Sequence, residues 1–518
     1  MWRYAIILII LLIIVYFLLF HIDTIKEYII KYWKIIASIL IIGIIYILWQ
    51  SDIIEHNIQL GGSNKKTKYK IKFMQFNIEN GGMLVDFSKV IDAIKLANPD
   101  IVAIEEANGN MKLIAEKAGF PYYDVRTQIM SQYPIIDPND AEGVYVFIEI
   151  DHNKVIAVSN VHLPSDPYGP DELHKGESHR KVTKLEKELR LFALQKQIKV
   201  LPKLQKLPIF LAGDFNAPSH LDCKLDQEKC FTWPISLTLE KIGFIDAFRE
   251  VYPDPNKEHG YTWWANRPKV KDDWNPTIND KHDRIDFVYV LGPVKTESGK
   301  IIGESHITPW PSDHRAIVFD FTVKLVNPPT YISVNKRLFN NNDKITIKYN
   351  ISKNINNEKI VIRKINHNNN LKEFSIQDTY GDIVINNNDL DPGHYEALLM
   401  LRDKILARTP FSIKLNTKVT HITEVTTDKK TYSIGEKIKV NWTNAPGNRF
   451  DWVVIKKEDA SENDDIIHWV KTGATIYGSH TFQKNNTDEW PLNPGIYDVI
   501  YMIDDSHKSI ARTKIHVQ

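Results

Sequence analysis

The order of apolar and polar residues divides the chain into three regions. Residues 4–20 carry no charge and no proline, and residues 35–49 form a second, shorter apolar run. From residue 71 short apolar stretches alternate with amphipathic ones, and from about residue 327 short alternating runs are separated by polar turns. Apolar spacing of three and four predicts helices, whereas alternation with a period of two predicts strands. The pattern thus predicts an apolar anchor, a mixed α+β region and an all-β region.

The two N-terminal apolar runs predict membrane-spanning helices. The first run is near the lower limit for crossing a bilayer core. The second reaches that length only if residues 32–34, with a snorkelling lysine, are included. A cleaved signal peptide would need a shorter apolar core and small residues at the cleavage site, whereas the chain has His-Ile-Asp at residues 21–23. We expect a retained anchor in residues 1–50, as a two-helix hairpin rather than one span.

The segment after the anchor predicts a tether. Residues 51–69 are polar, contain Gly61-Gly62 and end in several lysines. In a hairpin, Arg3 and these lysines would lie on one side of the membrane, and the positive-inside rule then leans towards a cytoplasmic catalytic region. The lysines are far from the second run, so the side stays open. We therefore expect an integral membrane protein in contact with the lipid bilayer.

In the middle region, acids, amides and histidines repeatedly stand where a predicted strand begins or ends. One such polar strand end would be typical of an ordinary loop, but an ordered series of them over about 250 residues is not expected by chance. Several carboxylates buried together are stable only if a cation neutralises them. Oxygen ligands without cysteine favour Mg²⁺, Mn²⁺ or Ca²⁺ over zinc. The residues are Asn77, Glu105, Glu106, His162, Asp214, Asn216, Asp283, Asp286, Asp313 and His314.

This ordered series resembles the endonuclease/exonuclease/phosphatase superfamily, which has the DNase I-like fold. The resemblance covers about half of the chain. It implies an α+β catalytic domain in residues 70–325, built as a two-sheet β-sandwich flanked by helices. It also implies that the active site lies at one edge of the sandwich.

The resemblance assigns a metal site as well. It implies that Glu106, Asn77 and Asp313 hold the cation, with Mg²⁺ expected and Mn²⁺ or Ca²⁺ as alternatives. Glu106 is preferred to Glu105 because the family commonly has Gln-Glu here and the second position is the ligand. The acid at Glu105 departs from that pattern, and it either tunes metal affinity or is solvated.

Five catalytic residues follow from the same resemblance. His162 matches the histidine that contacts the scissile phosphate. Asp214 and Asn216 match the pair that orients water and binds a phosphate oxygen. His314, oriented by Asp286, matches the acid/base histidine. The implied reaction is in-line attack of water on phosphorus.

Several features between the motifs remain open. Residues 164–178 could form one rim of the site. Residues 181–204 predict a surface helix that faces a sheet with an apolar row. Three tryptophans either stack on a base or sugar of the substrate or pack inside the domain, and internal packing is favoured. Asp283 either assists Asp286 or is a turn residue. The apolar row is Leu185, Leu189, Phe192, Leu194 and Ile198, and the tryptophans are Trp263, Trp264 and Trp274.

The C-terminal third contains an internal repeat. LDPGHYEALLM begins at Leu390 and LNPGIYDVIYM at Leu492, so that Pro392 and Pro494 lie 102 residues apart. This spacing is the size of one β-sandwich. We expect two immunoglobulin-like sandwiches, in residues 326–417 and 418–518, that act as rigid supports or bind a protein or glycan partner.

Composition narrows the function further. The 65 basic and 64 acidic residues give a net charge of +1, so a global basic field for nucleic acid is absent. The two cysteines, Cys223 and Cys230, are too few for a disulfide framework or a zinc site. They form either one disulfide that closes a small loop or two free thiols.

We therefore expect a membrane-anchored, divalent-metal-dependent phosphoesterase that hydrolyses a phosphodiester or phosphomonoester. The predicted anchor favours a lipid or surface-confined substrate. The alternatives are a sphingomyelinase- or phosphoinositide-phosphatase-like lipid hydrolase, a deoxyribonuclease-like nuclease, and a non-catalytic surface scaffold or adhesion protein.

Overall fold

The computed structural model describes most of residues 68–518. The predicted anchor and nearly all of the tether lie outside the described residues, as does Trp274. No helix of the described part is long and apolar enough to cross a bilayer. The gaps within the described part are 204–205, 224–229, 271–281, 341–342, 353–357, 366, 387–389, 414–422, 459–465, 474, 485–489, 505 and 507.

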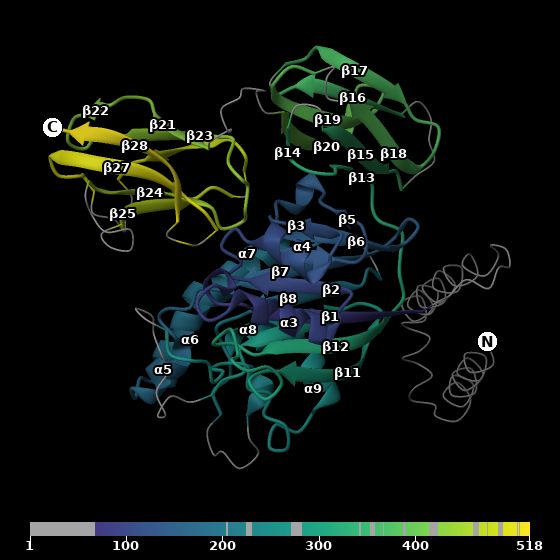
Figure 1. Cartoon of the computed structure of the whole chain (residues 1–518), viewed down its shortest axis with the longest axis vertical. Coiled ribbons are helices and arrows are strands. Elements are labelled where there is room, and N and C mark those ends of the chain that lie inside the picture. Colours follow the sequence, from purple (N-terminus) through teal and green to yellow (C-terminus); the bar gives the residue numbers. More distant parts are fainter. Residues whose placement is uncertain are drawn as a thin grey trace, which may run out of the picture. The chain divides into compact units, whose positions relative to one another are not determined.

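Two six-stranded sheets form the first part of the described chain (Figure 1). The first sheet has the order β11 (Val294–Ile302), β12 (Ala316–Val323), β1 (Tyr69–Asn77), β2 (Ile101–Glu105), β4 (Ile129–Ser131) and β3 (Tyr122–Asp124). The second has the order β5 (Ile135–Ile136), β6 (Tyr145–Asp151), β7 (Lys154–His162), β8 (Ile209–Asp214), β10 (Asp286–Leu291) and β9 (Ile245–Asp246).

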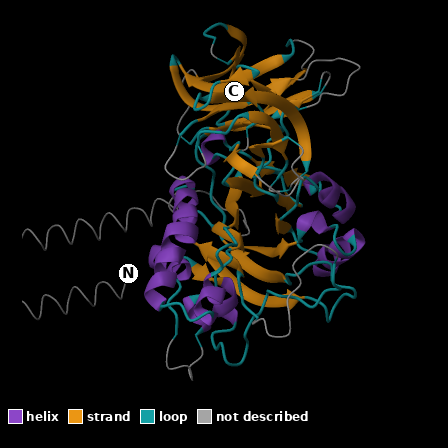
Figure 2. Cartoon of the chain, turned by 90° about the vertical axis from the view of Figure 1, so that its left-hand side faces the viewer, coloured by secondary structure: helices purple, strands orange, loops and turns teal. Residues whose placement is uncertain are grey.

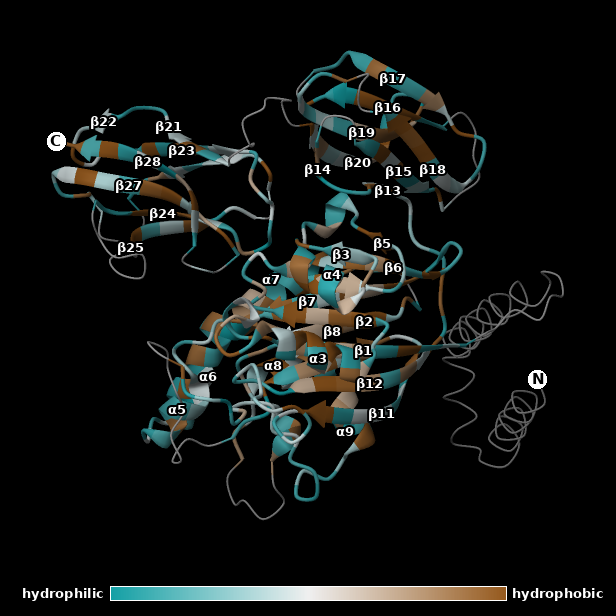
Figure 3. Cartoon of the chain, in the orientation of Figure 1, coloured by the Kyte–Doolittle hydropathy of each residue, from teal (hydrophilic) through white to brown (hydrophobic). Residues whose placement is uncertain are grey.

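The two sheets share an apolar core because their central strands are apolar on the faces that meet. Phe73 of β1 and Phe210 of β8 stack with ring centroids 5.4 Å apart. Ile101, Val158 and Phe319 belong to the same buried cluster. In Figure 3, β7 and β12 carry mostly apolar positions. The burial of both faces explains why these strands read as apolar runs rather than as strict alternation.

Helices lie along the outer sides of the strand layers (Figure 2). Helix α3 begins after Asp86, which accepts a hydrogen bond from the Ser88 backbone, and it ends at Asn98 in the left-handed region. The helices are α3 (Phe87–Ala97), α4 (Met111–Ala118), α5 (Gly169–His174), α6 (His179–Glu186), α7 (Phe192–Val200), α8 (Pro234–Ile242) and α9 (Ala247–Val251). The predicted α+β class of this part is therefore confirmed.

Strand pairing brings the polar strand ends to one edge. β1 and β2 are parallel, with Asn77 opposite Glu105, and β7 and β8 are parallel, with His162 opposite Asp214. β10 is antiparallel to β8 and starts at Asp286, directly opposite Asp214. The amino end of an antiparallel strand lies beside the carboxyl end of its neighbour, so these ends meet at the same edge of the sandwich.

The predicted helix after β7 forms, and Leu194 and Ile198 of its apolar row pack in the core, but Phe192 does not. Helices α6 and α7 are joined by a π-helical segment, η3 (Lys187–Leu191), which shifts the rows of side chains. Phe192 is consequently 53% exposed, whereas Glu186 and Arg190 are buried. Glu186 and Arg190 form an ion pair at 2.7 Å, which explains how charged residues occupy the inner face.

The C-terminal part is β-rich and repeats one arrangement twice. Each repeat has a three-stranded and a five-stranded sheet around one apolar core. The first repeat has β13 (Tyr331–Val334), β15 (Lys344–Asn350) and β18 (Tyr380–Asn386), with β14 (Leu338–Phe339), β20 (Lys404–Ile413), β19 (Gly393–Leu401), β16 (Glu358–Lys364) and β17 (Asn370–Ser375). The second has β21 (Glu424–Thr427), β23 (Ile438–Thr443) and β26 (Gly478–Phe482), with β22 (Thr431–Tyr432), β28 (Ser509–Val517), β27 (Gly495–Met502), β24 (Trp452–Lys457) and β25 (Ile466–Lys471).

The repeat seen in the sequence has a structural counterpart. Tyr395 and Tyr497 occupy equivalent positions in β19 and β27, and each hydroxyl donates to a backbone carbonyl four residues upstream, at 2.5 and 2.7 Å. Such a tyrosine at the corner between two sheets is typical of immunoglobulin-type sandwiches. The immunoglobulin-like assignment itself stays a prediction.

Candidate active site

His314 is held in place by the turn that carries it. Its backbone N–H donates to Ser312 Oγ at 3.0 Å, and Ser312 Oγ donates to the Asn77 carbonyl at the end of β1. Trp310 Nε1 donates to the His314 carbonyl at 2.7 Å. The turn before β12 is thus fixed against β1, and only 6% of the His314 side chain is exposed.

Asp286 faces His314 from the other sheet. His314 Nδ1 lies 2.9 Å from Asp286 Oδ2, and Gln75 Nε2 donates to Asp286 Oδ1 at 2.7 Å. Thr262 Oγ1 accepts the backbone N–H groups of Ile285 and Asp286 at the start of β10. Both carboxylate oxygens of Asp286 therefore have partners, and the predicted pairing of Asp286 with His314 is present as geometry.

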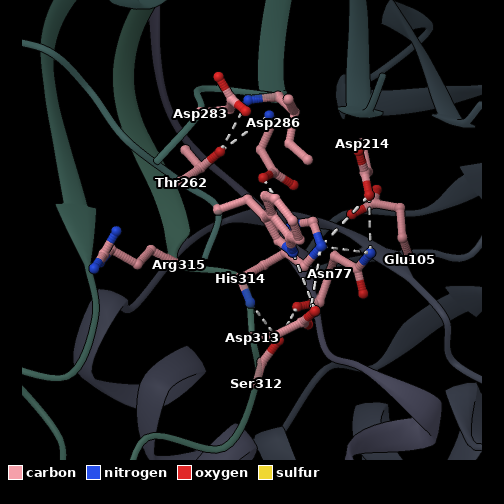
Figure 4. Close-up of polar contacts among 12 residues, drawn as sticks. Asn77, Glu105, Asp214, Thr262, Asp283, Asp286, Ser312, Asp313, His314 and Arg315 are labelled. Atoms are coloured by element: carbon pink, nitrogen blue, oxygen red, sulfur yellow. Dashed lines mark hydrogen bonds and ion pairs between the residues drawn. The ribbon is translucent and has the colours of Figure 1, made fainter. Parts of the chain in front are cut away.

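Asp214 lies at the centre of the cluster. Its Oδ2 is 3.1 Å from Asn77 Nδ2, 3.6 Å from His314 Nε2 and 3.7 Å from His162 Nε2. Figure 4 shows Asn77, Asp214 and His314 pointing toward one another, whereas Arg315 points away. Residues from three other strand ends thus converge on the Asp214 carboxylate.

Glu106 and Asp313 lie on the more open side of the cluster. Glu106 Oε1 is 3.1 Å from Asn77 Nδ2 and 4.0 Å from His162 Nε2, and Glu106 Oε2 accepts the Asn80 backbone N–H. Asp313 Oδ1 is 3.9 Å from His314 Nε2. All three predicted metal ligands therefore adjoin the predicted catalytic residues.

Glu105 differs from the expectation of a solvated acid. It is 1% exposed, and its Oε2 accepts a hydrogen bond from Gln75 Nε2 at 2.6 Å. Burial raises the pKa of Glu105 well above its usual value, and the nearby Asp286 carboxylate adds to this effect. Because β2 ends at Glu105 and alternate side chains face opposite ways, Glu105 points into the sandwich while Glu106 turns out to the edge.

The electrostatics of the cluster are those of crowded, buried carboxyl groups. Burial and the neighbouring Asp286 together raise the pKa of Asp214 to about 6, although His314 opposes part of the rise. Burial and the neighbouring Glu106 also raise the pKa of Asp313. Burial alone would lower the pKa of His314, but the facing carboxylates of Asp286, Asp313 and Asp214 raise it well above its usual value. The site holds more negative than positive charge.

The donor set fits a hard divalent cation. Asp214, Asp286 and His314 offer ligand atoms that all lie within 4.8 Å of one another. Asp286 is already engaged by His314 and Gln75, so the oxygens of Glu106, Asp313 and Asp214 are the better candidates. Carboxylate oxygens of this kind are the usual ligands of Mg²⁺.

Asn77 fits that role less directly. Its Oδ1 accepts the Glu79 backbone N–H at 3.1 Å, so its Nδ2, and not its oxygen, faces the carboxylates. An amide can be turned to exchange these two atoms. Asn77 would therefore offer a ligand oxygen only in the reverse orientation, and in the present one it is a hydrogen-bond donor to Asp214 and Glu106.

Asn216 follows Asp214 but does not point at the cluster. Its backbone N–H donates to Asp214 Oδ1 at 2.8 Å, and its Nδ2 donates to the Leu163 carbonyl at 2.9 Å. It connects the ends of β7 and β8, which carry His162 and Asp214. A role in binding a phosphate oxygen stays a prediction.

One rim of the site is formed by the loop after β7, within the predicted segment 164–178. Tyr168 donates to Asp283 Oδ2 at 2.9 Å and packs edge-on against Trp263 with centroids 5.5 Å apart. Trp263 Nε1 in turn donates to Asp313 Oδ2 at 3.2 Å. Packing rather than an exposed stacking platform therefore describes Trp263, and Asp283 acts as a hydrogen-bond acceptor on this rim.

Two charged networks that support the site were missed by the sequence reasoning. Glu79 accepts the Asp313 backbone N–H at 3.0 Å and pairs with the buried Arg267. Arg284, two residues before Asp286, bonds to Asp222 at 2.6 Å and to Asp246 at 2.7 Å. The only signal for Arg284 was a charged residue at the entry of an apolar strand, which does not identify its partners.

The chain is similar in sequence to known proteins. A sequence model described as the endonuclease/exonuclease/phosphatase family matches residues 74–314. An uncharacterized protein of Caenorhabditis elegans is 32% identical over 295 residues, which span 49% of this chain and 92% of the relative. An exodeoxyribonuclease of Bacillus subtilis is 26% identical over 193 residues, which span 33% of this chain and 64% of that protein.

A solved structure is similar over a longer stretch. The endonuclease/exonuclease/phosphatase from Beutenbergia cavernae is 15% identical, covers 66% of this chain and 99% of its own, and has a TM-score of 0.33. The sequence matches, and not this structural likeness, carry the assignment.

Proposed function

The chain belongs to the endonuclease/exonuclease/phosphatase family, and on that premise we propose that it is a divalent-metal-dependent phosphoesterase. It hydrolyses a phosphodiester or phosphomonoester by in-line attack of water. One observation carries the proposal: His314 Nδ1 lies 2.9 Å from Asp286, and His314 Nε2 lies 3.6 Å from Asp214. Asp286 thus fixes one nitrogen of the His314 imidazole, and the other nitrogen faces the site where a proton can be transferred.

His314 moves the proton in this mechanism. The facing carboxylates favour the imidazolium, so Nε2–H can be delivered to the leaving oxygen. After that transfer Asp286, which is acceptor-only when ionised, keeps Nδ1 protonated and leaves Nε2 able to accept a proton. Asp214 Oδ2, which lies close to Nε2 of both His314 and His162, orients the attacking water by accepting its hydrogen bond.

The phosphate is held by charge and by a hydrogen-bond donor. Glu106 and Asp313 would hold a divalent cation, which would supply Lewis-acid stabilisation of charge on the phosphoryl oxygens. His162 Nε2 faces the same space and donates to those oxygens, whereas Asn77 Nδ2 donates to Asp214 and Glu106 and so fixes these two carboxylates. Phosphoryl transfer depends mainly on such positioning and charge stabilisation, so the fixed geometry accounts for most of the expected catalysis.

Three observations bear on the substrate class. An anchor in residues 1–50 would confine the site near a bilayer, which favours a lipid such as sphingomyelin or a phosphoinositide. The named activity of the Bacillus subtilis relative, an exodeoxyribonuclease, favours nucleic acid instead. The net charge of +1 provides no global field for duplex DNA. We therefore place a lipid phosphoester first and nucleic acid second.

The side of the membrane is also a proposal. Lysine positions lean weakly towards a cytoplasmic catalytic domain. A disulfide joins Cys223 and Cys230, with Cα atoms 5.6 Å apart, and disulfides persist in oxidising compartments. The disulfide is the more specific of the two features, so we propose that the catalytic domain lies on the non-cytosolic side. Alkylation of free thiols before and after reduction tests this, and reduced cysteines in the native protein would contradict it.

The experiment that tests the function uses the full chain in mild detergent. Sphingomyelin, phosphoinositides, plasmid DNA and nucleotides are each incubated with the protein and Mg²⁺, then with EDTA. We expect hydrolysis of one class with Mg²⁺ and none with EDTA. The absence of hydrolysis of every class in Mg²⁺, Mn²⁺ and Ca²⁺ would favour the non-catalytic scaffold instead.

A further inference from the structure

Two loops of the second C-terminal repeat lie beside the active site, and the carboxyl group of Asp451 joins them by hydrogen bonds. Asp451 is fully buried and accepts hydrogen bonds from the Asn448 backbone at 3.0 Å, the Asp504 backbone at 2.9 Å and the Tyr501 hydroxyl at 3.1 Å. Asn448 precedes β24, whereas Asp504 follows β27. Both loops are therefore fixed relative to each other.

The loop after β27 binds the segment that carries Glu106. Asp504 Oδ2 accepts the Gly109 backbone N–H at 2.9 Å, and Asp504 Oδ1 accepts from Gln128 Nε2 at 2.5 Å. Gly109 lies three residues after Glu106. Gly109 has a φ of 82°, a left-handed conformation that other residues rarely adopt, so a glycine is favoured where Asp504 approaches.

The loop before β24 contacts the strand that carries His162. Arg449 Nη1 donates to the carbonyl of Asn160, two residues before His162 in β7. β6 pairs with β7 only as far as Ser159, so Arg449 takes up the carbonyl just beyond that pairing. The Phe450 ring stands perpendicular to the His162 imidazole, with ring centroids 6.4 Å apart. This is an edge-to-face aromatic contact.

The contact residues are specific to the second repeat. Aligning IVIRK of β16 with VVIKK of β24 places Asn356 and Asn357 where the second repeat has Arg449 and Phe450. Aligning the two Pro-Gly-X-Tyr segments places Arg402 where the second repeat has Asp504. The residues that build the fold, such as the corner tyrosines, recur in both repeats, whereas the residues that face the site do not.

We propose that the second C-terminal repeat is an integral part of the active site, and that Phe450 is a positioning residue for His162. The proposal rests on the proposed function, because it assigns a purpose to a fixed His162. The His162 side chain is 18% exposed at the edge of the site. The perpendicular Phe450 ring limits the rotation of this imidazole, while Asp504 and Arg449 hold the loop that presents Phe450.

The test compares Phe450→Ala with Phe450→Tyr in the full-length protein. Loss of an edge-to-face contact should lower kcat roughly 3- to 10-fold with little change in KM, and tyrosine should restore it. Ile434→Ala is the matched control, because Ile434 is a 53% exposed apolar residue of the same repeat. Circular dichroism and the melting temperature establish that each variant is folded.

A second readout does not require activity. Diethyl pyrocarbonate modifies accessible imidazoles, and peptide mass spectrometry locates the modification on His162. We expect the modification rate of His162 to rise severalfold in Phe450→Ala and in Asp504→Ala, and to stay unchanged in Ile434→Ala. Unchanged kcat together with an unchanged His162 modification rate in folded Phe450→Ala protein would overturn the proposal. An inactive wild type would overturn the proposed function alone, since the modification rate still tests the contact.

Discussion

His314 and Asp286 come from different sheets, yet their side chains meet at 2.9 Å through Nδ1 and Oδ2. Neither strand fixes this contact by itself. It arises because the turn before β12 is tied to Asn77 through Ser312, and because Gln75 of β1 holds the other oxygen of Asp286. The acid/base pair is therefore a product of how the two sheets face each other.

Removing this pair should abolish most of the activity. We expect His314→Ala to lower kcat roughly 100- to 10,000-fold, the range of a lost general acid or base. Asp286→Asn should lower kcat too, because an amide no longer selects the protonated nitrogen of His314. Phosphate-ester hydrolysis at saturating Mg²⁺ measures both. His306→Ala, at an exposed histidine, should retain full activity.

The adjacent acids at the end of β2 should respond differently to the same change. Glu106→Gln removes a charge from the open side of the cluster, and we expect a loss of about 100-fold or more in kcat/KM. The raised pKa of Glu105 favours the neutral carboxyl group, which a glutamine amide resembles in size and charge. Glu105→Gln should change the free energy of unfolding by less than about 1 kcal/mol. Equal loss of activity in both variants would show that the two acids share one role.

Cation binding should release protons. Burial raises the pKa of Asp214 to about 6, so near pH 6 a fraction of this carboxyl is protonated and competes with the cation. The Kd for Mg²⁺ should therefore rise as pH falls from 8 through about 6. Calorimetry in buffers of different ionisation enthalpy counts the released protons. Asp214→Asn should release fewer, and a pH-independent Kd in the wild type would contradict this prediction.

The buried arginine beside the site should be essential for stability. Arg284 is 2% exposed and bonds to both Asp222 and Asp246, while Arg249 also bonds to Asp222. Arg284→Ala removes the ion pair of the buried Asp246 carboxylate, and we expect a loss of about 3–5 kcal/mol in the free energy of unfolding. Lysine cannot reach both acids with a planar fork, so Arg284→Lys should recover only part of it.

Denaturant unfolding measures these losses. Arg180→Ala, at an exposed arginine on α6, should leave the midpoint nearly unchanged. A comparable loss at Arg180 would show that the effect is not specific to the network around Arg284.

Much of the site could be predicted because it follows from local pattern. Asn77, His162 and Asp214 each end an apolar strand, and strand ends of one sheet edge meet once the pairing is known. The roles of Gln75 and Glu105 could not be predicted in the same way. Their side chains point between the sheets, and the partner of each belongs to a different strand.

The errors have equally physical causes. Phe192 was placed wrongly in the apolar row of the helix after β7, because a π-helical segment adds a residue to one turn and brings Glu186 and Arg190 inside. Leu194 and Ile198 of the same row do pack in the core. The Phe450–His162 contact joins residues 288 positions apart and follows no periodic pattern. Such contacts depend on tertiary packing, which a single sequence does not display.

The most direct test of the account is hydrolysis of bis-p-nitrophenyl phosphate by the full-length protein. The wild type is assayed with Mg²⁺, after EDTA, and after Mg²⁺ is restored, beside His314→Ala. We predict activity that EDTA removes, that added Mg²⁺ restores, and that His314→Ala lacks. Hydrolysis that is unchanged by EDTA, or that persists in folded His314→Ala protein, would contradict a single cation-dependent site at the sheet edge.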